Sequence, residues 1–157
     1  MAKNFKIFVA LLLVLITSAC QAKEEIVKDE LVETDTNDME NMKIQIIVGD
    51  YIVYANLYDN KAARQFYEML PQTFPMRNLY DREMCYRMGN GALLDSTAQD
   101  IGYETGDISY WPPAGSLVIL YRQNGEVFEQ VKIGHTDDDI SFFDGLKEID
   151  ITFEKVN

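Results

Sequence analysis

The 157-residue sequence has few of the residues that most catalytic centres use. It contains one histidine, two cysteines and one tryptophan. It has no CxxC pair, no glycine-rich phosphate loop and no Ser-His-Asp arrangement. These absences exclude the common signatures of zinc sites, thiol redox centres, nucleotide binding and serine hydrolases. We therefore expect neither a cofactor nor a bound metal ion.

Basic residues are also scarce. Fourteen lysines and arginines stand against 26 acidic residues, so the formal net charge is −12. A chain this acidic is repelled by phosphate backbones, so we do not expect nucleic acid as a partner. It is also repelled by an anionic membrane surface, so attachment to a membrane would need something other than a basic patch.

The sequence has a single long hydrophobic run, at the N-terminus. Ile7 to Ile16 is an unbroken run of ten apolar residues, preceded by Lys3 and Lys6. A membrane-spanning helix needs about 20 apolar residues, so this run is too short to cross a bilayer. A basic start, a short apolar run and small residues after it are typical of a secretory signal. We assign residues 1–19 to a signal peptide, whose removal would take away two lysines and no acid and leave a net charge of −14.

Ser18 and Ala19 at the end of this signal, followed by Cys20, resemble the lipobox of bacterial lipoproteins, although Thr17 stands where that family usually has leucine. The resemblance implies that Cys20 is lipidated and that the protein is exported and anchored in the bacterial cell envelope. Several acyl chains anchor a protein firmly, because each buried CH₂ contributes about 0.8 kcal/mol. Plain secretion is the alternative. With Cys20 lipidated, Cys85 has no partner in the chain, and we expect it to be buried as a small apolar residue rather than to act as a nucleophile.

Residues 20–41 form a segment of different composition. Gln21 to Asn41 has eight acids, two lysines and no aromatic residue. Such a segment cannot bury enough apolar surface to offset its ordering entropy. We interpret residues 20–41 as a lipidated acidic tether and residues 42–157 as the folded domain.

Apolar alternation and turn residues predict the elements of that domain. Asp59 or Asn60 caps a helix whose apolar face is Ala63, Phe66, Tyr67 and Leu70. A short helical turn is expected within 140–146, a loop over 92–101, a non-helical connection over 112–115, and hairpin turns at 49–50 and 124–125. Strands are expected at about 43–48, 51–58, 72–79 (an edge or bulged strand interrupted at Pro75), 83–88, 107–111, 116–121, 127–133 and 147–156. Eight short antiparallel strands with few helices favour a closed barrel.

Four pieces of the domain are similar to the small bacterial cyclophilin-like domain: Leu70–Phe74, Gly106–Trp111, Ser116–Tyr121 and Gly134–Asp138. Their order and spacing match that family from about Met42 to Val156. The resemblance implies a mainly β fold, a closed eight-stranded antiparallel cyclophilin-like barrel with one or two short helices.

The same resemblance raises the question of catalysis. True cyclophilins are peptidyl-prolyl isomerases that place an arginine, within a Phe-His-Arg strand, against the prolyl amide in an apolar pocket. This sequence lacks Phe-His-Arg, so no catalytic residue can be carried over. Of the three arginines in the corresponding region, Arg77 and Arg87 are better candidates for a pocket than Arg82.

Aromatic residues beside Pro112-Pro113 suggest a ligand site at the barrel mouth, although packing alone would also explain them. The candidate ligand-binding residues are Phe74, Met76, Arg77, Arg87, Tyr110 and Trp111. The leading hypothesis is a monomeric, membrane-anchored exported lipoprotein whose domain binds a peptide or small ligand without catalysis. The alternative is a prolyl isomerase acting on exported proteins.

A metal-binding interpretation of His135 with Asp137, Asp138 and Asp139 is the third possibility. Adjacent aspartates do not converge on one ion unless a turn directs them. Acidic residues before the short helical turn are better explained as favourable charge at a helix N-terminus. We therefore assign no metal ligands.

Overall fold

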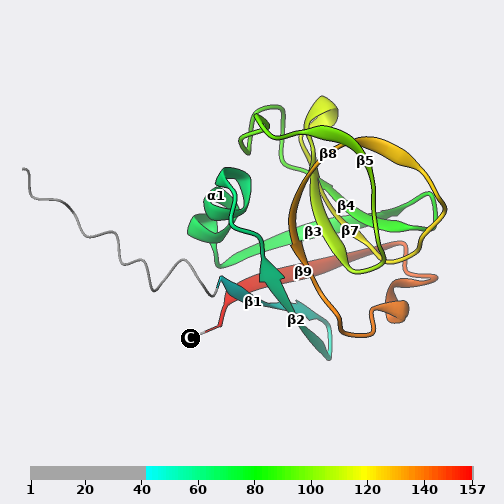
Figure 1. The fold of residues 1–157 in the computed structure, drawn as a ribbon. Coiled ribbons are helices and arrows are strands. Elements are labelled where there is room, and N and C mark those ends of the chain that lie inside the picture. The colour runs from blue at the N-terminus through cyan, green and yellow to red at the C-terminus, as the bar shows by residue number, and fades with distance from the viewer. Residues whose placement is uncertain (1–41, 157) are drawn as a thin grey trace, which may run out of the picture. The chain divides into compact units, whose positions relative to one another are not determined.

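The computed structural model describes residues 42–156, which form nine strands, one α-helix and two short 3-10 helices (Figure 1). The signal peptide over 1–19, the tether over 20–41 and the lipidated Cys20 lie outside the described residues. The strands are β1 (Lys43–Val48), β2 (Tyr51–Leu57), β3 (Gln72–Leu79), β4 (Glu83–Arg87), β5 (Gln99–Gly102), β6 (Asp107–Trp111), β7 (Ser116–Leu120), β8 (Val127–His135) and β9 (Glu148–Lys155). The helices are α1 (Lys61–Met69), η1 (Pro112–Ala114) and η2 (Ser141–Phe143).

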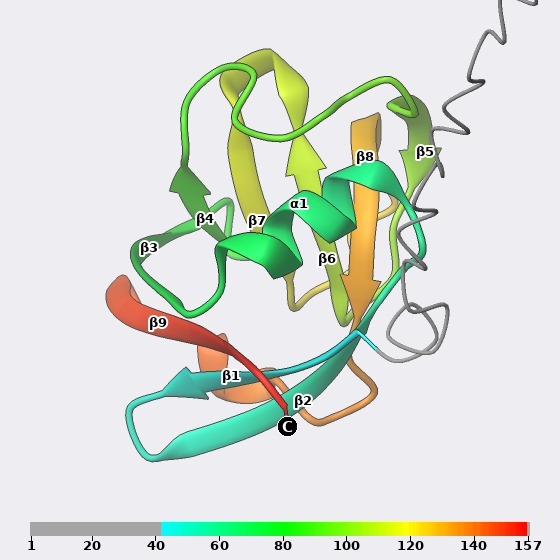
Figure 2. The same ribbon diagram turned by 90° about the vertical axis from the view of Figure 1, so that its left-hand side faces the viewer.

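Eight of these strands close into an antiparallel barrel. They pair in the order β2-β1-β9-β3-β4-β7-β6-β8, and a pairing between β2 and β8 completes the ring. Figure 2 shows α1 lying across one end of the barrel. The predicted fold class, a closed eight-stranded barrel with short helices, is confirmed.

Local sequence signals explain the helix and its position. The Asn60 side chain accepts a hydrogen bond from the Ala63 backbone N–H at 2.9 Å and donates to the Lys132 carbonyl at 2.8 Å. The first bond caps α1, and the second ties the cap to β8. Phe66 is fully buried, and its ring meets that of Phe153 edge-on at 5.3 Å. The predicted apolar face of α1 therefore anchors the helix to the barrel core.

Three local predictions are wrong, two of them because of a long-range pairing. The predicted loop over 92–101 ends in strand β5, which has a single apolar side chain at Ile101 and is held by pairing with the first half of β8. The predicted Asn124-Gly125 hairpin does not form, because β6 lies between β7 and β8 and pairs with both. Pro112-Pro113 begins a 3-10 turn, since a first helical turn does not need the N–H groups that proline lacks.

Strand β3 tolerates a proline because its two neighbouring strands pair with different parts of it. Strand β9 pairs with Gln72 to Arg77, whereas β4 pairs only with Arg77 to Leu79. Pro75 therefore lies where β3 has a neighbour on one side, and its missing N–H interrupts no second ladder. The strand is an edge strand over this half only.

Barrel closure depends on a close backbone approach at Gly134. This residue pairs with Ile108 of β6 on one side and Leu57 of β2 on the other. A Cβ at this position would lie 2.7 Å from the Leu57 side chain and 2.9 Å from the Asn56 carbonyl oxygen. The second contact is with backbone, which cannot move without disturbing the short β2–β8 pairing.

We predict that Gly134→Ala lowers the free energy of unfolding by about 2 kcal/mol, since overpacking a tight contact typically costs about 1–3 kcal/mol. Chemical denaturation of the purified chain measures this. Gly102→Ala is the matched control, because nothing lies within 4 Å of a Cβ there. It should change stability by no more than about 0.5 kcal/mol. Equal effects of the two substitutions would show that closure tolerates a larger residue at Gly134.

Candidate functional site

The larger of two neighbouring hollows lies on the outer surface where β3 and β4 pair. We call it the arginine groove. Its volume is about 460 Å³. It is lined by Pro75, Arg77, Leu79, Cys85, Tyr86, Arg87 and Glu148.

Strand register brings the two arginines of this groove to the same face. Arg77 of β3 is the cross-strand partner of Cys85 on β4, so their side chains lie on one side of the sheet. Arg87 follows Cys85 by two residues and points the same way. Arg77 is 72% exposed and its Nε donates to Glu148 at 2.9 Å. Arg87 forms no ion pair with any residue in 42–156.

The floor of the arginine groove is apolar. Cys85 is buried, as expected from the sequence, and packs with Leu79 in a small apolar cluster on the outside of the barrel. Burial raises the pKa of the Cys85 thiol, which disfavours the thiolate needed for a nucleophile. Phe74 stacks on Tyr86 with ring centroids 4.6 Å apart and so supports the groove wall from beneath.

The second hollow adjoins the first across β4. We call it the aromatic groove. Its volume is about 300 Å³. Val118 on its floor is the cross-strand partner of Cys85 on the floor of the arginine groove. The lining residues are Tyr80, Arg82, Glu83, Trp111, Val118, Glu126 and Phe128.

A buried arginine organises the aromatic groove. Arg82 is only 8% exposed. Its guanidinium carbon lies between 5.2 and 5.8 Å from the ring centroids of Tyr80, Tyr103 and Phe128, the range of cation–π contacts. Its Nε donates to Glu83 Oε2 at 3.1 Å, and its Nη1 pairs with the Glu126 carboxylate.

Glu83 is a buried carboxylate whose charge is only partly compensated. Burial raises the pKa of Glu83, and the charge and hydrogen bond of Arg82 offset that rise only in part. Arg82 bonds to one oxygen of the Glu83 carboxylate, and no other side chain within 42–156 donates to that carboxylate. The groove therefore contains a carboxylate with an unused acceptor.

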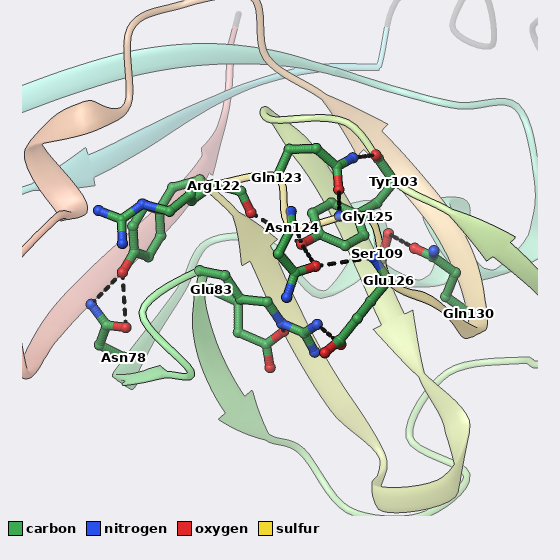
Figure 3. Close-up of polar contacts among 12 residues, drawn as sticks. Asn78, Glu83, Tyr103, Ser109, Arg122, Gln123, Asn124, Gly125, Glu126 and Gln130 are labelled. Carbon is green, nitrogen blue, oxygen red and sulfur yellow. Dashed lines mark hydrogen bonds and ion pairs between the residues drawn. The ribbon is translucent and has the colours of Figure 1, made fainter.

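The segment between β7 and β8 carries Glu126 into the groove. Figure 3 shows the polar contacts that hold it. The Tyr103 hydroxyl donates to the Asn124 side chain, with 2.7 Å between the oxygens, and the Gln123 amide donates to the Tyr103 carbonyl. Farther along, the Ser109 hydroxyl donates to Gln130 at 2.7 Å, and Gln130 donates to the Ile101 carbonyl at 2.9 Å. These bonds fix β5 and the segment over the outer face of β6 and β7.

His135 belongs to a different cluster, centred on Asp107. Asp107 is 2% exposed and contacts His135 Nδ1 at 2.9 Å, Lys132 Nζ at 2.7 Å and the Glu104 backbone N–H at 2.9 Å. Burial alone would raise the pKa of Asp107, but the hydrogen bonds from Lys132, Glu104 and His135 outweigh it and lower that pKa. The cluster locks β6 to the end of β8. Residues 42–156 contain no group of three or more histidine, cysteine, aspartate or glutamate side chains that could hold a metal ion.

The structure separates the six candidate ligand-binding residues. Arg77 and Arg87 both line the arginine groove, and Trp111 lines the aromatic groove. Phe74 lies beneath the arginine groove. Met76 and Tyr110 are 0% exposed in the barrel core, so we include neither in the candidate site.

Arg82 lines the aromatic groove, although the sequence made it the weakest pocket candidate of the three arginines. It follows Tyr80 and Asp81, which both have left-handed backbone conformations, with φ of 57° and 50°. This tight turn brings Arg82 back over the outer face of the sheet. Four further lining residues were not predicted as site residues: Tyr80, Glu83, Glu126 and Phe128. They come from separate strands and turns, and the local sequence pattern does not indicate that they line one groove.

The fold and these hollows define a small closed β-barrel with ligand-sized grooves on its outer face. No helix within the described residues is long and apolar enough to cross a membrane.

Comparison with known proteins agrees with this class. The model of the cyclophilin-like family matches residues 46–154, and the chain belongs to that family. The fold is similar to the solution structure of the hypothetical protein AF2241 from Archaeoglobus fulgidus, with a TM-score of 0.57 and 15% identity over 74% of this chain and 95% of that one. At that identity the likeness shows the fold alone. No protein of curated function matches the sequence.

Proposed function

We propose that the arginine groove binds a peptide or small ligand that carries an anionic group on an apolar body, and that it does so without catalysis. The observation that carries this proposal is the pairing of two guanidinium groups with an apolar floor, in a chain whose net charge is −12. Against that background, a local excess of positive charge selects for anions.

The two arginines contribute differently. Arg77 is already paired with Glu148, whereas no residue within 42–156 forms an ion pair with Arg87. A hydrogen bond to a charged group contributes about 1.5–3 kcal/mol, and solvent exposure at this groove reduces that contribution toward 1 kcal/mol. Packing of an apolar group on Leu79, Cys85 and Tyr86 supplies the remainder of the affinity.

Prolyl isomerisation is the second candidate function, favoured by one observation: Arg77 and Arg87 lie beside an apolar groove. Catalysis by such an arginine requires a guanidinium held against the prolyl nitrogen in a site from which water is excluded. Arg77 is largely exposed and engaged with Glu148, which favours binding over catalysis.

The first residues of the chain support placing this binding domain at a membrane outside the cytoplasm. A signal peptide over 1–19, a lipid on Cys20 and a tether over 20–41 would carry the barrel on the surface of a bacterial membrane. The ligand would then be met in the cell envelope, and the domain would act as a monomer.

We expect N-acetylphenylalanine to bind the full-length chain in detergent at least fivefold more tightly than its neutral amide, because only the acid can accept charge-assisted bonds from Arg87. Isothermal titration calorimetry measures both constants. Arg87→Ala should remove the preference, whereas Arg64→Ala on α1, which does not line the groove, should preserve it. Equal binding of acid and amide to the unaltered chain would contradict the proposal.

A proline-limited refolding assay should show no acceleration by the purified chain. Acceleration that Arg77→Ala or Arg87→Ala abolishes would establish the isomerase function instead. Acceleration that survives both substitutions would point to a site other than the arginine groove.

Cys20→Ser should release the protein from the membrane fraction into the soluble fraction, because the thiol that accepts the lipid is lost. Fractionation followed by immunoblotting measures the distribution. Cys85→Ser is the control and should leave the protein at the membrane. Unchanged fractionation of Cys20→Ser would exclude lipidation as the anchor.

A further inference from the structure

We infer that the aromatic groove is a second binding site, which takes an ammonium or guanidinium group attached to an aromatic or other apolar body. The residues that line it share no member with the arginine groove. The inference therefore does not depend on the function proposed above.

Charge is the first reason for a cationic ligand. Two carboxylates, Glu83 and Glu126, line the groove against the single positive charge of Arg82. Glu83 is buried and keeps an acceptor that no residue in 42–156 uses. A ligand ammonium would satisfy that acceptor and balance the local charge, and the net charge of −12 would attract the cation from a distance.

Ring geometry is the second reason. Tyr80, Trp111 and Phe128 present aromatic surface to the groove, and Tyr80 is 77% exposed. The Arg82 guanidinium already lies within cation–π range of Tyr80 and Phe128, so aromatic rings of this groove contact a cation within the protein itself. Trp111 has no stacked ring or cation partner among the described residues. It is therefore the ring available to a ligand.

An anionic ligand would have to use Arg82 in place of Glu126. The Glu126 side chain is 58% exposed and could leave, but it would lose its partner, and the ligand would add negative charge beside buried Glu83. Both changes are unfavourable in an acidic chain. The groove thus favours a cation, and the experiment below distinguishes the two.

Trp111 provides the measurement, because it is the only tryptophan in the sequence and lines this groove but not the arginine groove. The full-length chain in detergent is titrated with phenethylamine, 2-phenylethanol and phenylacetate, which share an aromatic body and differ in charge. Phenethylamine should change the tryptophan fluorescence saturably and bind at least tenfold more tightly than 2-phenylethanol. Equal binding of these two, or no response to the amine, would overturn the inference.

Two substitutions test the carboxylates. Glu126→Gln and Glu83→Gln should each weaken phenethylamine binding at least fivefold, whereas Glu148→Gln and Arg87→Ala in the arginine groove should leave it unchanged. Glu126 is exposed, so its substitution tests the site even if Glu83→Gln unfolds the protein. Phenylacetate binding that becomes tighter in Glu126→Gln would instead identify an anion site on Arg82 and overturn the inference.

Discussion

The barrel closes where the backbones of β2, β6 and β8 approach one another at Gly134. There β8 touches β6 on one side and β2 on the other, and a two-residue pairing with β2 closes the ring. Asp107 reinforces this seam by binding both His135 and Lys132 of β8. Because only the C-terminal half of β8 is used in closure, its N-terminal half is free to pair with β5. That extra pair places Phe128 and Tyr103 outside the barrel, where they surround Arg82.

The outer surface of β4 thus separates two hollows with different chemistry. On the β3 side, two arginines flank an apolar floor; on the β7 side, two carboxylates and three rings surround a buried arginine. The floor is continuous between them, since Cys85 and Val118 are cross-strand partners. The two grooves therefore have opposite net charge although they are neighbours. Within each groove an ion pair offsets part of that charge, Arg77 with Glu148 in one and Arg82 with Glu83 in the other.

The sequence predicted correctly those helices and strands that nearby residues stabilise. Asn60 caps α1, alternation marks β1 and β2, and the apolar run from Ser116 to Leu120 forms a fully buried strand. Apart from the 3-10 turn at Pro112-Pro113, whose cause is local, the errors concern partners distant in sequence. Strand β5 has almost no apolar residue and exists because β8 pairs with it, and the Asn124-Gly125 turn joins strands that β6 keeps apart. Likewise, Arg77 and Arg87 could be predicted as site residues from their strands. The aromatic rings around Arg82 could not be predicted, because Tyr103 and Phe128 are distant from it in the sequence.

The order of strands around the ring also governs when the fold can form. The first strand, β1, lies between β2 and the last strand, β9, and Gln45 of β1 bonds to Glu154 of β9 across 109 residues. A growing chain can make the β1–β2 hairpin early, but it cannot close the ring until β9 has emerged. Topologies with such distant pairings fold slowly and expose their strand edges for longer. Because β1 and β9 are neighbours in the ring, one edge of β1 stays without its partner strand until β9 has been made.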